Sequence, residues 1–155
     1  MNSIYESHNY DISFRGVLSE NKVLKLFTNN DCIEVSSEID FDINADYKSS
    51  LNYFASATLG GIIHSIVNQS KHENFEIEEI EGKIHFILKN PLTLLGVKGY
   101  NEEPKIDTCK IIIYLYADIE DNELIEFCNN ALKRSFIYNT LKSSIDINIE
   151  FIPIV

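Results

Sequence analysis

Hydrophobic and polar residues alternate over the first forty residues of the chain. Apolar positions cluster in 12–17, 23–27 and 33–41, and polar clusters rich in Asn, Asp and Ser separate them at 19–21 and 29–31. Short β-rich runs between such clusters are typical of strands joined by turns. We therefore expect an antiparallel meander at the start of the chain.

The hydrophobic period changes after residue 50. Apolar residues then recur at steps of three and four, as one face of a helix requires. The members of this stripe are Leu51, Ala55, Thr58, Leu59, Ile62, Ile63 and Ile66. Asp46 or Ser49 is expected to cap the helix. The stretch 51–67 contains polar residues and is shorter than the ~20 residues of a membrane span. Residues 1–11 are polar and lack the basic-then-apolar pattern of a secretion signal. We expect a core helix of a cytoplasmic protein.

Two later runs return to strand chemistry. In 75–89, alternate apolar residues share one face, and Gly82 permits either a bulge or a tight bend. In 105–118 both faces are apolar, which places this strand at the centre of a sheet or against another subunit. The loop 90–104 between them is long, and its apolar residues either cover an edge of the core or form a lid over an apolar site.

A second helix is expected over 120–135. Acidic residues occupy its first turns and basic residues its end, which suits the helix dipole. Its apolar stripe consists of Leu124, Phe127, Cys128, Ala131, Leu132 and Ser135. A short helical continuation to Leu141 and a strand around Ile149 complete the chain. The predicted class is α+β, an antiparallel sheet in the order β-β-β-α-β-β-α-β with two central helices, in one domain spanning 1–155.

Composition narrows the classes of function. The 24 acidic residues outnumber the 13 basic ones, and the net charge of -11 argues against nucleic-acid binding. The cysteines Cys32, Cys109 and Cys128 form no CxxC pair, so no zinc ribbon or thioredoxin-like motif is present and a reducing compartment is expected. Histidine spacing suggests no metal site, and no phosphate-loop or Rossmann glycine motif appears. We expect no cofactor.

Gly60 and Gly61 lie inside the first predicted helix. Each is less favourable there than alanine by ~1 kcal/mol. Close approach of another backbone or of a ligand is the usual reason for such glycines. We expect this turn to pack tightly against a second helix, either from the same chain or from a partner subunit.

The segment Ala57-Thr58-Leu59-Gly60-Gly61-Ile62, together with Ser135-Phe136-Ile137-Tyr138-Asn139-Thr140-Leu141 downstream, resembles the two signature helices of the OsmC/Ohr family (osmotically inducible protein C and organic hydroperoxide resistance protein). In that family the first motif reads like A-L-G-G-C and the second like C-P-V-x-x-T-L. The element order also matches from about Tyr10 to Phe151. The resemblance implies an intertwined homodimer in the stress response, with peroxidatic and resolving cysteines that reduce organic hydroperoxides.

The chain departs from that apparatus. The first cysteine position falls on Ile62 and the second on Ser135. The position of an assisting glutamate falls near Asn52 or Tyr53, and Arg15 stands in a context that resembles a structural strand turn more than the family's catalytic arginine. Because this route of peroxide reduction needs a thiolate, the two-cysteine mechanism is absent whatever the fold.

Several hypotheses on function stay open. In the first, the protein binds a small apolar ligand at the dimer interface, in a pocket near the loop 92–97. The expected contacts are Ile62, His64, Ser135 and Tyr138. In the second, a residual hydroperoxide reductase uses Cys128, two helical turns before Ser135, as a relocated thiol. A core cysteine is the plainer account of Cys128, and a purely structural dimer is a third hypothesis. No nucleic acid and no membrane are expected as partners.

Overall fold

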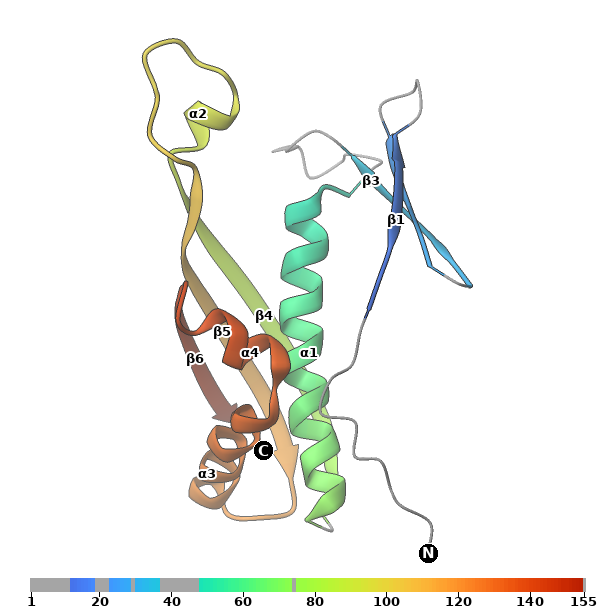
Figure 1. Cartoon of the computed structure of the whole chain (residues 1–155). Helices are drawn as coiled ribbons and strands as arrows, with labels where there is room; N and C mark the ends of the chain where they lie inside the picture. Colours follow the sequence, from blue (N-terminus) through green and yellow to red (C-terminus); the bar gives the residue numbers. More distant parts are fainter. Residues whose placement is uncertain (1–11, 19–22, 29, 37–47, 74, 155) are drawn as a thin grey trace, which may run out of the picture. The chain divides into compact units, whose positions relative to one another are not determined.

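The structure is a computed structural model that describes residues 12–18, 23–28, 30–36, 48–73 and 75–154 (Figure 1). The chain divides between Tyr53 and Phe54 into two compact units, and each is described by itself. Three strands, a long helix, two strands, a helical region and a last strand follow one another, which confirms the predicted α+β class and element order. None of the helices in the described ranges is long and apolar enough to cross a membrane.

The first unit contains a three-stranded antiparallel meander. Its strands are β1 (Arg15–Leu18), β2 (Val23–Phe27) and β3 (Cys32–Ser36). The central strand β2 pairs with both neighbours. The predicted meander is confirmed for these strands, and the apolar positions predicted at 39 and 41 lie outside the described residues.

Helix α1 (Ser50–His72) begins with a reciprocal cap. The Ser49 hydroxyl oxygen accepts from the Asn52 N–H at 3.4 Å, and the Asn52 side-chain oxygen accepts from the Ser49 N–H at 3.0 Å. Such a capping box satisfies donors that the first helical turn leaves unpaired. Of the two predicted caps, Ser49 is confirmed, and Asp46 lies outside the described residues.

The second unit contains a sheet in the order β4-β5-β6. Its strands are β4 (Ile77–Lys89), β5 (Lys105–Ala117) and β6 (Asp146–Pro153). The central place of β5 confirms the prediction from its two apolar faces. The sequence predicted an antiparallel sheet, but β6 runs parallel to β5 while β4 runs antiparallel to it. The reason is the helical connection between β5 and β6, because a crossover of that length returns the chain to the end where it started.

That connection consists of three helical segments. They are α3 (Asp121–Ala131), the 3-10 turn η1 (Leu132–Arg134) and α4 (Phe136–Leu141). All six residues of the stripe predicted for the region 120–135 are buried. The five apolar members of the stripe form a single core cluster with buried residues of α1 and of one face of β5, so α1 and α3 cover the same face of the sheet (Figure 1).

Gly82 lies on β4 beneath α1. Of the bulge and the tight bend that the sequence permits at this position, the bulge is not formed, because the irregularities of the β4–β5 pairing lie at 77–79 and 87–88. A Cβ atom at Gly82 would stand 2.7 Å from Leu59 Cδ1 and 2.9 Å from Ile63 Cδ1. The missing side chain therefore makes room for α1 against the sheet.

The connection 90–104 carries the short helix α2 (Pro91–Leu94) at the far end of the β4–β5 hairpin (Figure 1). Its apolar side chains are exposed rather than packed. They are Leu92, Leu94, Leu95, Val97 and Tyr100. The prediction that they cover an edge of the core is therefore wrong for the described part of this chain.

Candidate functional site

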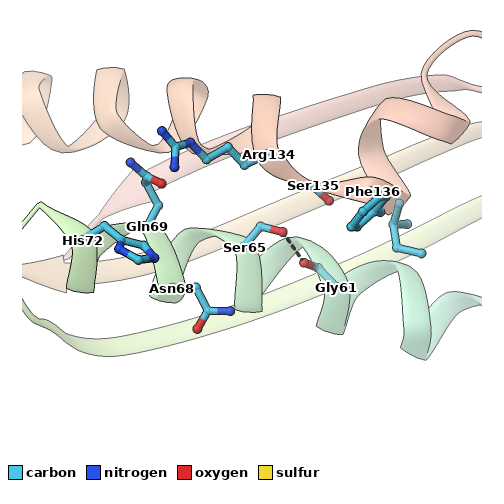
Figure 2. Close-up of a pocket in the computed structure, with 9 residues that line it drawn as sticks. Gly61, Ser65, Asn68, Gln69, His72, Arg134, Ser135 and Phe136 are labelled. Atoms are coloured by element: carbon cyan, nitrogen blue, oxygen red, sulfur yellow. Dashed lines mark hydrogen bonds between the residues drawn. The ribbon is translucent and has the colours of Figure 1, made fainter. Parts of the chain in front are cut away.

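A cavity of about 370 Å³ lies between α1 and the η1–α4 segment (Figure 2). The lining residues from α1 are Gly61, Ser65, Asn68, Gln69 and His72, and those from the facing segment are Arg134, Ser135, Phe136 and Ile137. All of them belong to the second unit. Pockets for small molecules have volumes of roughly 300–1,000 Å³, so this cavity has room for a small ligand.

The α1 side of the cavity is a polar stripe. Gly61, Ser65, Asn68 and His72 follow one another at steps of four, three and four residues, which places them on one helix face. Figure 2 shows them in a row along α1, with the η1–α4 segment facing them. The same spacing is present in the sequence, where the apolar stripe of the helix is the stronger signal.

Gly61 makes the close helix crossing possible. A Cβ atom there would stand 2.8 Å from Ile137 Cγ1 of α4, well inside the 3.5–4.0 Å at which carbon atoms attract. A Cβ atom at Gly60 would meet nothing within 4 Å. The predicted close approach is confirmed for Gly61, with α4 as the second helix, and is wrong for Gly60 within the described part of the chain.

Ser135 lines the cavity and also caps α4. Its side chain is only 1% exposed, and its hydroxyl oxygen accepts from the Tyr138 N–H at 3.2 Å. Serine is one of the preferred residues at this helix position. Where the resemblance places a resolving cysteine, this chain has a helix cap.

The other predicted ligand contacts do not line the cavity. Ile62 is 0% exposed within the core cluster. His64 is exposed, and Tyr138 is half-buried against the core. The loop 92–97, which the sequence hypothesis placed beside the pocket, contributes no lining residue either. The polar stripe of α1 and Arg134, the residue next to Ser135, were not predicted from the sequence.

The two ends of the cavity differ in chemistry. Arg134, Gln69 and His72 gather at one end (Figure 2). The Gln69 amide nitrogen donates to the Glu73 carboxylate at 2.7 Å, which fixes the amide. At the other end lie Ile137 and Phe136, and Phe136 is 90% exposed. The lining mixes polar and apolar groups, so it differs from the apolar pocket that the sequence predicted.

No thiol is found among the lining residues. Cys128 is 0% exposed, and burial raises the pKa of its thiol to about 12. Burial likewise raises the pKa of Cys109 to about 11. At neutral pH the thiolate fraction of Cys128 is then roughly one in 10⁵, and only the thiolate is a good nucleophile. Cys32 is exposed and lies in the first unit.

The remaining positions of the family's apparatus have structural roles in the first unit. Asn52 completes the cap of α1. The Tyr53 hydroxyl donates to the Glu34 carbonyl oxygen at 2.9 Å. Arg15 is exposed, with its guanidinium carbon 5.5 Å from the centre of the Phe27 ring. In the described residues no group of three His, Cys, Asp or Glu side chains could hold a metal ion.

Solved structures share this arrangement over almost the whole chain. An OsmC-like protein from Mycoplasma pneumoniae matches with a TM-score of 0.72 and 13% sequence identity, covering 93% of this chain and 99% of that protein. The chain has the OsmC/Ohr fold. An organic hydroperoxide resistance protein from Elizabethkingia anophelis has a TM-score of 0.69 and 9% identity, covering 94% of this chain and 99% of that one. An organic hydroperoxide resistance protein from Bacillus subtilis has a TM-score of 0.59 and 12% identity, covering 90% of this chain and 98% of that one.

At these identities the likeness concerns the OsmC/Ohr fold alone. No protein-family model matches the chain, and no curated protein sequence matches it either. The fold that the motif resemblance implied is therefore confirmed by structure, while the activity has to be argued from the residues of the site.

Proposed function

We propose that this protein is a binding protein with the OsmC/Ohr fold that lacks two-cysteine peroxidase chemistry, forms a homodimer and holds a small ligand in the cavity between α1 and η1–α4. The observation that carries the proposal is a cavity without a lining thiol. Of the two positions where the resemblance expects cysteines, Ile62 belongs to the core and Ser135 caps a helix.

The chemistry of the lining favours an amphipathic ligand over a wholly apolar one. Polar side chains of α1 and Arg134 would contact the polar part of such a ligand. Phe136 and Ile137 would contact its apolar part. Pockets that combine apolar walls with a few polar groups are typical of small-molecule sites, because the polar groups fix the orientation of the ligand.

Exposed apolar side chains support the homodimer. Phe136 at the rim of the cavity is 90% exposed, and the tip of the β4–β5 hairpin exposes further large apolar residues. Large exposed apolar groups commonly mark surfaces that a partner covers. We propose that a second copy covers Phe136, so that the cavity lies at the dimer interface. We also propose that residues 1–155 act as one domain, since the solved proteins of this fold align with nearly the whole chain.

The competing hypothesis, a hydroperoxide reductase that uses Cys128, has less support. Its thiol is fully buried, its pKa is raised, and it is not among the residues that line the cavity. A nucleophile must reach its substrate and ionise, and Cys128 meets neither condition. In a hydroperoxide-consumption assay with a dithiol reductant we expect no turnover. Turnover that disappears in Cys128→Ser would overturn this part of the proposal.

The binding proposal is tested with three probes of equal chain length: octanoate, octan-1-ol and octylamine. Isothermal titration calorimetry is expected to show binding of at least one probe, with one site per chain. Ser65→Leu, which adds bulk inside the cavity, is expected to abolish that binding. Ala57→Leu makes a similar change at an exposed position of α1 outside the lining and serves as the control.

Two outcomes contradict the proposal. If none of the three probes binds, or if Ser65→Leu binds as well as the Ala57→Leu control, the cavity is not a ligand site. Native mass spectrometry at micromolar concentration tests the dimer separately. A chain that remains monomeric there refutes the homodimer and the interfacial position of the cavity.

A further inference from the structure

We propose that the ligand of the cavity is a small organic carboxylate, whose negative head is held by Arg134 and whose apolar part lies toward Phe136. This inference rests on the proposed function, because it names the ligand class of the same cavity. It concerns the charge of the ligand, and the outcomes of its test distinguish a wrong ligand class from the absence of a ligand site.

The charge of the lining is the first argument. The chain has 24 acidic and 13 basic residues, yet no Asp or Glu is found among the described residues that line this cavity, and Arg134 is its one formally charged group. A second hollow, of about 610 Å³, beside the end of β5 has the opposite character. Its lining includes Asp118, Glu120, Asp121 and Glu123 and no basic residue. The cavity beside α4 is therefore a local positive site on an acidic protein, which attracts anions.

The second argument is that Arg134 has its charge available. Within the described residues its guanidinium forms no ion pair; the basic residues that do are Lys25, Lys83 and Lys89. Glu73 is bonded to a lining residue, but its carboxylate accepts from Gln69 and forms no ion pair with Arg134 within the described residues. A guanidinium offers five N–H donors, and no carboxylate of the described chain uses those of Arg134.

The third argument is the arrangement of the lining along the cavity. Figure 2 shows the Arg134 side chain extending toward Gln69 and His72, while Phe136 lies at the opposite end beside Gly61. The imidazole of His72 forms no hydrogen bond with any described residue, so it adds a possible donor beside the guanidinium. A ligand with a charged head and an apolar tail satisfies both ends at once, whereas a purely polar or purely apolar molecule satisfies one.

The number of cations favours a carboxylate over a phosphate. A single guanidinium matches a carboxylate in charge and forms two parallel N–H···O bonds with it. A phosphate ester carries up to two negative charges, and its sites gather several cations or backbone N–H groups. This lining supplies one arginine and neutral donors, which suits a singly charged head group.

The test compares the same three probes on four forms of the purified protein: the unaltered chain, Arg134→Gln, Lys133→Gln and Ser65→Leu. Lys133→Gln removes the same charge one residue away, from a side chain that is not in the lining. We expect octanoate to bind at least about tenfold more tightly than octan-1-ol or octylamine, as expected for a charge-assisted hydrogen bond. Arg134→Gln is expected to remove that preference, and Lys133→Gln to retain it. Rising salt concentration should weaken octanoate binding and leave octan-1-ol binding unchanged.

The outcomes separate the two proposals. Equal binding of all three probes, lost in Ser65→Leu, supports the ligand cavity and refutes the carboxylate site. A preference for octanoate that survives in Arg134→Gln refutes the role of Arg134. No binding of any probe refutes both proposals. Arg134 is exposed at the end of η1, so circular dichroism of Arg134→Gln is expected to match that of the unaltered chain.

Discussion

Replacing Gly61 by alanine is expected to destabilise the protein, whereas the same replacement at the neighbouring Gly60 is expected to stabilise it. Both glycines lie inside α1, so alanine gains about 1 kcal/mol of helix propensity at either position. The difference comes from packing. The new Cβ atom would stand 2.8 Å from Ile137 Cγ1 at position 61 and would meet nothing within 4 Å at position 60.

The size of the effect follows from these two terms. Overpacking by one methyl group costs about 1–3 kcal/mol in a well-packed region. Gly60→Ala should therefore gain about 1 kcal/mol, while Gly61→Ala should lose up to about 2 kcal/mol after the helix gain is subtracted. For a chain of this length, 1 kcal/mol corresponds to a shift of about 2–4 °C in Tm. The two variants should thus differ by several degrees, with opposite signs.

Thermal and urea unfolding followed by circular dichroism measure both variants. Ile137→Ala provides the second arm of a double-mutant cycle, because a smaller side chain at 137 removes the atom that the new methyl group meets. We expect Gly61→Ala to cost less in the Ile137→Ala background, with a coupling energy of about 1 kcal/mol or more.

Each of three results would contradict part of this reasoning. The first is a Gly61→Ala variant as stable as Gly60→Ala, since the close contact would then have no energetic consequence. The second is an additive double-mutant cycle, which would place the strain of Gly61→Ala somewhere other than Ile137. A loss of stability in Gly60→Ala that depends on protein concentration would contradict the expected gain and place a second copy against that glycine.

Further predictions concern Ser135 and the cysteines. Ser135→Ala removes the cap of α4 and is expected to lower the free energy of unfolding by about 1 kcal/mol in urea titrations. In the native protein an aromatic disulfide reagent is expected to modify only Cys32, which is exposed. In denaturant it is expected to modify the buried Cys109 and Cys128 as well. Fast reaction of Cys128 in the native protein would contradict its burial. Between pH 9 and pH 12 the Cys128 thiol stays protonated in the folded chain but ionises in the unfolded chain. The free energy of unfolding is therefore expected to keep its full contribution from Cys128 below pH 9 and to fall as the pH rises toward 12. The Cys128→Ala variant is expected to show a smaller fall. If its free energy of unfolding depends on pH as that of the unaltered chain does, Cys128 is not the cause.

The pattern of residues was sufficient for most of the fold. The three- and four-residue spacing of the apolar residues located α1 and α3, and the apolar character of both faces of β5 placed it at the centre of its sheet. These features are local, because a helix or strand reveals its buried face through its own period. The parallel pairing of β6 was missed because it depends on the crossover through α3 and α4 rather than on any residue of β6.

The candidate site was harder to predict. The motif resemblance led to Ser135 and to the glycine turn, and both border the cavity. It also led to Ile62, whose side chain is in the core, and to His64, which is exposed outside the lining. A position in a motif fixes where a residue stands along a helix, but the direction of its side chain relative to a neighbouring helix depends on how the two helices pack.

The sequence by itself determined the elements, the absence of cysteine at positions 62 and 135 and the need for a close contact at the glycine pair, since each follows from residue identity and spacing. Only the tertiary structure decided which glycine makes that contact and which residues surround the cavity. Gly61 meets Ile137 and Gly60 meets nothing, although the two are adjacent in sequence. Arg134 lines the same cavity as the polar stripe of α1, although more than sixty residues separate them in the sequence. Contacts between distant segments depend on the crossing of α1 and α4, which no local period encodes.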